Sequence, residues 1–237
     1  MGNHPVPHQG AKYIIMRPQL IVQAANIILR GQFIPTMFHP AWFATQNLIR
    51  QQEAKEAEIK VIVPDVAVFE AEWLQVEVTR DRFRAATFQE AFYESLRDVV
   101  VGTFTVLHQT PLRVMGINRE FHYEFDSEKA WHAVGNRLAP KEDWDEMLDN
   151  PGMKSLTMEG KRTDDYTGYI QVRVAPSTRV RFGVFVEVND HYVLTSDKEI
   201  SASTSDLETI LAKEWLDSMK RSWEMAEIIS AFGDLSK

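Results

Sequence analysis

The sequence contains no cysteine, which excludes disulfide bonds, thiolate metal ligands and cysteine nucleophiles. No apolar run reaches the roughly 18 residues that a membrane-spanning helix needs. Four signatures of enzymes and nucleotide-binding proteins are also missing: G-x-G-x-x-G, G-x-x-x-x-G-K, G-x-S-x-G and H-E-x-x-H. These absences argue against dinucleotide oxidoreductases, P-loop NTPases, typical serine hydrolases and zinc proteases that carry the last motif.

The composition is that of a folded globular protein. The 237 residues are 44% hydrophobic and 25% charged, and they include 6 Trp and 13 Phe, which supply large side chains for a core. The net charge of −8 opposes binding to nucleic acid and to anionic lipid. The first ten residues lack the basic and apolar regions of a secretory signal. We therefore expect a cytoplasmic protein that contacts no membrane, and we disfavour nucleic acid as a partner without excluding local binding through basic clusters.

The sequence suggests one boundary within the folded part of the chain, at residues 139–152. We expect residues 1–12 to form a flexible arm and residues 13–237 to form a single domain. The acidic, proline-containing segment 139–152 would divide this domain into two lobes, 13–139 and 151–237. No Gly/Ser-rich linker separates the lobes, which favours a shared core over independent domains.

The most regular alternation of apolar and polar residues runs from Val66 to Thr87. Its apolar residues change parity between Trp73 and Leu74, and one extra residue moves the apolar set to the opposite face of a strand. The pattern therefore predicts a β-bulge at this step, or a strand that passes between two packed layers. A turn at residues 79–82 and a short return strand around Phe83 follow.

Further strands and helices are predicted along the rest of the chain. Strands are expected at 19–29, 60–63, 112–125, 154–161, 169–175 and 182–194, and helices at 41–58, between Thr87 and Pro111, after Ser127, and from Ser205 to Gly233. Capping boxes are expected at Thr87–Glu90 and Ser205–Glu208. The predicted fold class is α+β: a mainly antiparallel sheet in two sequence-adjacent lobes, with helices on one face and a long C-terminal helix.

Several short motifs, spread over nearly the whole chain, resemble one family of proteins. They are Phe38-x-Pro40-x-Trp42-Phe43, Leu74-x-Val76-x-Val78-Thr79-x-Asp81-Arg82-Phe83, Gly116-Ile117-Asn118, Leu138-Ala139-Pro140, Pro151-Gly152-Met153 and Leu156-x-Met158-Glu159-Gly160. The chain resembles a sporadically distributed, functionally uncharacterised family of bacterial proteins of similar length. The resemblance implies a bacterial cytoplasmic protein of an accessory or mobile-element system, and it implies no catalytic or binding residues.

Two predicted strands carry polar side chains on one side. Glu120 and His122 share a side of the first strand, and Glu187 and His191 share a side of the second. If these strands were neighbours, their imidazoles and carboxylates could converge on a divalent metal such as zinc, iron(II) or manganese. The alternative explanation is the solvated face of an antiparallel sheet, which has the same alternation. We favour this second explanation, because the residues match no specific metal-binding motif.

Six arginines form two clusters near predicted turns: Arg80, Arg82 and Arg84, and Arg173, Arg179 and Arg181. Guanidinium groups in such positions can hold a phosphate or an acidic segment of a partner. A solvated turn surface, balanced by neighbouring carboxylates, explains the same pattern.

The sequence favours a non-catalytic binding or assembly protein over an enzyme, because the four signatures named above are missing. Such a protein would recognise a partner protein, or a second copy of itself, through an exposed sheet face and the arginine-bearing turns. No cofactor is expected for this function. The alternative function is that of a metal-assisted enzyme centred on His122 and His191.

Overall fold

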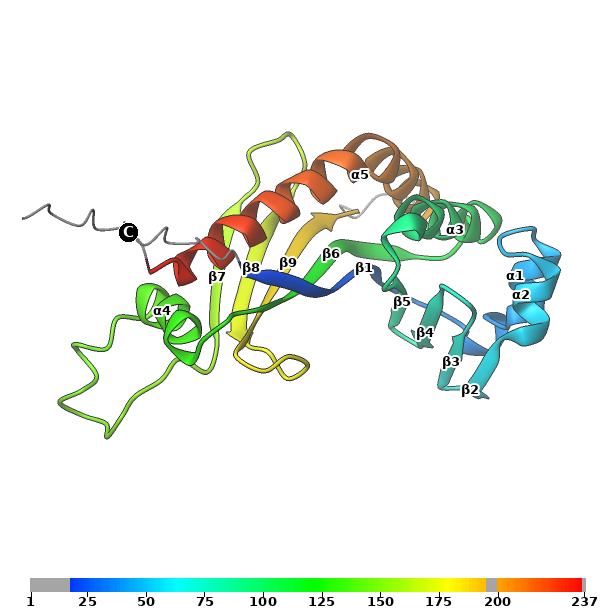
Figure 1. The fold of residues 1–237 in the computed structure, drawn as a ribbon. Helices are drawn as coiled ribbons and strands as arrows, with labels where there is room; N and C mark the ends of the chain where they lie inside the picture. The colour runs from blue at the N-terminus through cyan, green and yellow to red at the C-terminus, as the bar shows by residue number, and fades with distance from the viewer. Residues whose placement is uncertain (1–17, 195–199, 236–237) are drawn as a thin grey trace, which may run out of the picture.

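A computed structural model describes residues 18–194 and 200–235, without the side chains of residues 200–202. Its main element is one antiparallel sheet in which nine strands follow the order β2-β3-β4-β5-β1-β6-β9-β8-β7 (Figure 1). The strands are β1 (Gln19–Gly31), β2 (Glu58–Val63), β3 (Val66–Glu70), β4 (Gln75–Thr79), β5 (Arg82–Thr87), β6 (Leu112–Glu124), β7 (Leu156–Lys161), β8 (Gly168–Pro176) and β9 (Gly183–Val193). This architecture confirms the predicted α+β fold with a mainly antiparallel sheet.

The two longest strands, β1 and β6, lie side by side in the middle of the sheet. Ile27 lies opposite Ile117, and Leu29 lies opposite Met115. These side chains point to one face because directly opposed residues of an antiparallel pair share a face. All four are buried, so the centre of the sheet contributes one continuous apolar surface.

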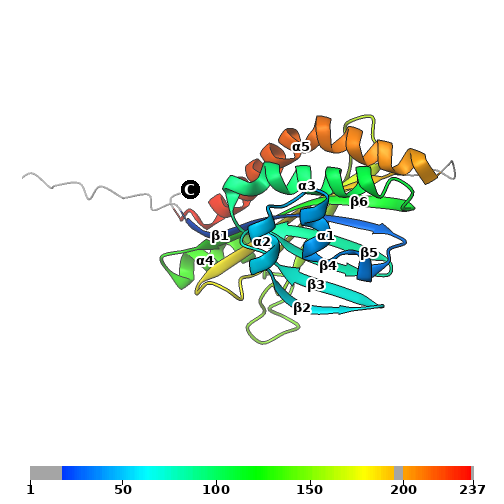
Figure 2. The same cartoon turned by 90° about the vertical axis from the view of Figure 1, so that its right-hand side faces the viewer.

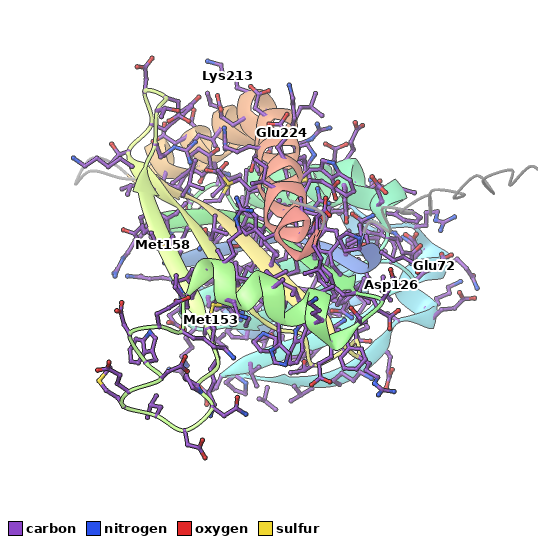
Figure 3. All side chains as sticks on the ribbon, turned by 60° about the vertical axis from the view of Figure 1, so that its left-hand side comes forward. Glu72, Asp126, Met153, Met158, Lys213 and Glu224 are labelled. Atoms are coloured by element: carbon purple, nitrogen blue, oxygen red, sulfur yellow. The ribbon has the colours of Figure 1, made fainter. Side chains whose placement is uncertain are left out.

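Two helices cover this apolar surface, α3 (Tyr93–Val106) and α5 (Ile200–Ser230). Figures 1 and 2 show both helices on the same side of the sheet. The predicted apolar stripes are confirmed: Leu96 and Val100 of α3 and Leu211 and Trp215 of α5 are buried. Lys213 and Glu224 of α5 point outward into solvent (Figure 3). Both helices therefore bury only the stripe that faces the sheet.

The buried apolar residues form two clusters on this side of the sheet. The larger cluster joins strands β1, β3, β4, β5 and β6 to α3, to α1 (Pro40–Thr45) and to the first half of α5. The smaller cluster joins β6, β8 and β9 to α4 (Glu128–Leu138) and to the second half of α5. Met153 lies next to α4 and packs against the smaller cluster (Figure 3). One sheet thus carries the strands of both halves of the chain.

The predicted bulge at Trp73 and Leu74 is wrong. The step is instead the turn of a hairpin between β3 and β4, closed by a 2.8 Å hydrogen bond from the Ala71 amide to the Leu74 carbonyl. Trp73 is buried at this turn because its Nε1 donates to Glu53 Oε1 over 3.0 Å and its ring stacks on Phe92 at 5.0 Å. A buried turn thus carries the apolar residues that are typical of a strand.

Three helix predictions also need correction. The helix predicted at 41–58 is two short helices, α1 and α2 (Gln51–Glu56), which are separated at Asn47, whose φ of 56° is left-handed. The Thr87 capping box does not form: Thr87 Oγ1 accepts a hydrogen bond from the Gln89 amide, and α3 begins only at Tyr93. Because α5 begins at Ile200, Ser205 lies inside the helix rather than at its cap.

The predicted boundary segment between α4 and β7 lies at the surface. Its backbone makes turns, and Trp144, Met147 and Leu148 are exposed on it. None of the helices described by the structure is long and apolar enough to cross a membrane. The predicted N-terminal arm, residues 1–12, lies outside the described residues.

Candidate binding face of the sheet

The sheet face opposite α3 and α5 is polar at its centre, in contrast to the apolar face beneath the helices. The strand register places side chains from five neighbouring strands together on this face. We call it the polar face and define it by Asn26, Arg84, Asn118, Glu120, His122, Arg173, Glu187, Asn189 and His191. Asn26, Asn118 and His122 are buried although they lie on the side away from the two helices. Buried polar groups require partners, so their hydrogen bonds identify what the face can still bind.

Asparagines of three adjacent strands form the central row of the polar face. Asn118 Nδ2 donates to Asn26 Oδ1 over 2.9 Å, and Asn26 Nδ2 donates to Glu120 Oε1 over 3.1 Å. Asn189 lies opposite Asn118, but its Oδ1 is buried without a hydrogen-bond partner. A Cβ atom at Gly116 would lie 3.1 Å from this oxygen, so the glycine leaves room for the amide. The row therefore offers one unused acceptor.

Two carboxylates lie opposite one another on β6 and β9, at Glu120 and Glu187. Burial raises the pKa of Glu120, and the charge of Glu187 raises it further, while Arg84, Arg179 and Arg173 act in the opposite direction. Glu187 accepts a 2.8 Å hydrogen bond from Arg173 Nε. One carboxylate of the pair is thus neutralised by an arginine, and the other is held by Asn26.

Arg84 is the polar-face cation that has no direct partner. Its side chain is half-buried, and within the described residues it makes no hydrogen bond and no ion pair. Burial lowers the pKa of Arg84. The charges of Glu120 and Glu77 raise this pKa, and the charge of Arg82 lowers it. A guanidinium carries five N–H donors and stays charged, so Arg84 presents unused donors on this face.

The other predicted arginines differ in what their side chains contact. Arg82 pairs with Glu77 at 3.0 Å, and Arg80 pairs with Asp65 at the surface. In the loop between β8 and β9, Arg179 lies 5.0 Å from the Phe88 ring and Arg181 lies 4.7 Å from the Phe182 ring. Of these six arginines, Arg84, Arg179 and Arg173 are the ones whose charges lower the pKa of Glu120. The two sequence clusters thus meet at the polar face, while Arg80 and Arg181 stay outside it.

The two candidate histidines share the polar face but lie far apart on it. His122 lies opposite Phe185, and His191 lies opposite Gly116, six positions along β6. This separation is roughly 20 Å at the rise of an extended strand, so one metal ion cannot reach both rings. In the described part of the chain, no three His, Asp or Glu side chains are grouped to hold a metal ion. The two strands are neighbours, as the metal-site hypothesis required, but their histidines and carboxylates do not converge on one point.

Each histidine has its own environment. His122 Nδ1 lies 2.8 Å from Ser177 Oγ, and burial, followed by the charge of Arg179, lowers the pKa of His122 to about 4. His191 stacks on Tyr169 with 4.2 Å between ring centroids. Its Nδ1 is buried without a partner, and burial lowers its pKa. Near neutral pH both rings are neutral, so the positive charge of the polar face comes from arginine.

Sequence reasoning missed Asn26 as a functional candidate. It lies within the apolar run of β1, and a lone amide in such a run was a usable signal of a buried polar contact. No protein-family model matches the chain, and no curated protein matches its sequence.

Proposed function

We propose that the chain is a non-catalytic binding protein that holds an acidic segment of a partner protein on its polar face, with Arg84 as the main contact. One observation carries this proposal: Arg84 is half-buried and charged, and no carboxylate of the described residues pairs with it. Burying an uncompensated charge costs free energy, which a carboxylate of a bound partner would offset.

Two further unused groups on the same face support the proposal. Asn189 Oδ1 and His191 Nδ1 are both buried without partners, and a peptide backbone would satisfy them through its N–H and C=O once the two side chains turn towards the surface. Their pairing partners on β8 are Gln171 and Tyr169, which continue the polar surface across the sheet. A bound segment that crosses the sheet from β5 to β9 would meet the guanidinium at one end and the amide and imidazole groups at the other.

The positions of the two histidines give little support to the alternative function, a metal-assisted enzyme. His122 is already hydrogen-bonded to Ser177, and the charge that acts on it is that of the cation Arg179. A metal ion would need a neutral imidazole together with carboxylates on the same side, and the other imidazole lies at the opposite end of the face. The resemblance of the sequence to a bacterial accessory family is compatible with a cytoplasmic binding or assembly role.

The test is capture of partner proteins from the native host by the tagged wild-type chain, by Arg84→Gln and by the control Arg80→Gln. Arg80 is an exposed arginine paired with Asp65 outside the polar face, so its loss should leave capture unchanged. Truncating one side of a buried charge pair weakens binding by about 30-fold or more, so Arg84→Gln should release the partner. A partner held equally by both variants contradicts the proposal.

A charge exchange makes the test specific. When the captured partner is known, its acidic residues are changed one at a time to lysine and combined with Arg84→Glu. One combination should restore binding that each single change abolishes. If the captured protein is a second copy of the chain, the same variants are measured by sedimentation, and Arg84→Gln should shift a dimer towards monomer.

A further inference from the structure

A second group of buried polar atoms lies on the other side of the sheet, beneath the helices. A hollow of about 540 Å³ opens between α3 and α5, and this size suits a small molecule. Its wall includes Tyr93 and Glu94 of α3, Arg119 of β6, and Trp215, Met219 and Trp223 of α5. Figure 2 shows the two helices running side by side over the sheet.

Arg119 is the charged group in this hollow, and its side chain is only partly satisfied. The residue is 4% exposed and lies on the mainly apolar face of the sheet that the helices cover. Its Nη2 donates to Gln23 Oε1 over 2.9 Å, and its Nη1 lies 3.5 Å from the Met219 sulfur. Its Nε is buried without a partner, and no carboxylate of the described residues pairs with it. A buried guanidinium without an anion is rare because its desolvation is not compensated.

Tyr93 supplies a second unused polar group beside Arg119. The Arg119 guanidinium lies 4.6 Å from the centroid of the Tyr93 ring. Among the described residues the buried Tyr93 hydroxyl has no acceptor and no well-aligned hydrogen bond, and the charged group that acts on it most is the Arg119 guanidinium, itself a donor. Both residues line the same hollow. Native proteins satisfy the great majority of buried polar atoms, so two unsatisfied donors at one hollow point to a missing acceptor.

Large apolar side chains of α5 form one part of the wall. Trp215 is buried, Met219 is half-buried, and Trp223 is 40% exposed at the entrance. Aromatic and thioether groups contact aliphatic and aromatic ligands well. The hollow thus combines a cation at its base with an apolar wall.

The charged groups at the rim are more negative than positive, which disfavours a ligand that carries several negative charges. Glu90 and Glu94 line the hollow together with Lys220. Glu90 Oε2 accepts a 2.9 Å hydrogen bond from Gln23 Nε2, and this contact turns the Gln23 oxygen towards Arg119. The carboxylates at the rim would repel a dianion such as a phosphate monoester.

We propose that this hollow binds a small amphipathic carboxylate, with its carboxylate on Arg119 and the Tyr93 hydroxyl and its apolar part against Trp215, Met219 and Trp223. The site is distinct from the polar face because the two lie on opposite sides of the sheet.

The test compares octanoate with the matched neutral alcohol octanol, using thermal unfolding and calorimetric titration of the full chain. A ligand that binds only the folded state raises the midpoint of unfolding as its concentration passes its dissociation constant. Octanoate should raise the midpoint, and octanol should have a much smaller effect. Equal shifts for the acid and the alcohol, or no shift for the acid, overturn the proposal.

Three variants locate the site. Arg119→Gln should weaken octanoate binding by about 30-fold or more, because it removes the buried cation. The matched control is Arg137→Gln, which removes an exposed α4 arginine that lies over Phe232, outside the hollow, and should leave binding unchanged. Tyr93→Phe deletes a single hydroxyl and keeps the ring, so it tests the site even if Arg119→Gln fails to fold. Octanoate binding that is unchanged in Tyr93→Phe, or reduced equally by the control, overturns the assignment.

Discussion

Asp190 is the shared acceptor of a buried ion network that ties β9 to α5 and to the segment that follows β7. Its two carboxylate oxygens pair with Arg162 and with Arg221, and the Tyr192 hydroxyl donates to it over 3.3 Å. The side chain of Asp190 is 3% exposed and that of Arg162 is 1% exposed. Asp190→Asn keeps the shape of the side chain but removes the charge that both arginines share.

The expected loss follows from what remains after the change. Arg162 keeps a 2.8 Å hydrogen bond to Asp164, and Arg221 is partly exposed, so solvent compensates part of the lost pairing. Removing one partner of a buried pair costs about 3–5 kcal/mol, and we expect the free energy of unfolding to fall by about 3 kcal/mol, at the lower end of this range. The remaining charge of Asp164 and the exposure of Arg221 are the reasons for this choice.

Equilibrium unfolding in urea, followed by circular dichroism and by tryptophan fluorescence, measures this change. The control is Asp81→Asn, which removes an exposed carboxylate paired with Arg30 at 2.8 Å and should change stability far less. The double variant Asp190→Asn/Arg162→Met should recover part of the loss, because it no longer buries an unpaired guanidinium. A single variant as stable as the control would refute the reasoning.

The remaining predictions concern pH and packing. The pKa of His122 is lowered to about 4 in the folded protein from an ordinary value of 6.5, so the unfolded chain takes up the proton first. The free energy of unfolding should therefore fall as pH drops from about 6.5 towards 4, and it should fall less in His122→Asn. Urea titrations at several pH values measure both changes. Phe104 is buried, and its ring lies 5.1 Å from the Phe83 ring. Phe104→Ala should lower the free energy of unfolding by about 3–5 kcal/mol, and a loss as small as that of a substitution at an exposed position would contradict its core role.

Much of the sheet could be predicted from the sequence because alternation is a local property. The faces of β6 and β9 were assigned from period two alone, and both assignments hold in the structure. The polar face was visible in the same way, through Glu120, His122, Glu187 and His191. Which strands are neighbours was not visible, because register depends on contacts between residues far apart in the chain.

The errors also have physical causes. Trp73 and Leu74 look like strand residues because they are apolar, yet they form a turn, whose burial depends on Glu53 and Phe92. Local turn chemistry was overridden by tertiary packing at this position. The metal site stayed an open alternative at the level of sequence for a related reason: adjacency of two strands does not determine how far apart two side chains lie along them.

The sequence by itself determined the fold class, most of the strands with the faces of β6 and β9, the apolar stripes of the helices and the absence of thiol chemistry. Only the tertiary structure decided which charges are compensated. Arg82 and Arg84 are equivalent in sequence, yet one pairs with Glu77 and the other has no ion pair among the described residues. Arg119 lies in the middle of a strand and becomes notable only because α3 and α5 bury it. Compensation of a buried charge depends on long-range neighbours, and the local pattern of a sequence does not contain them.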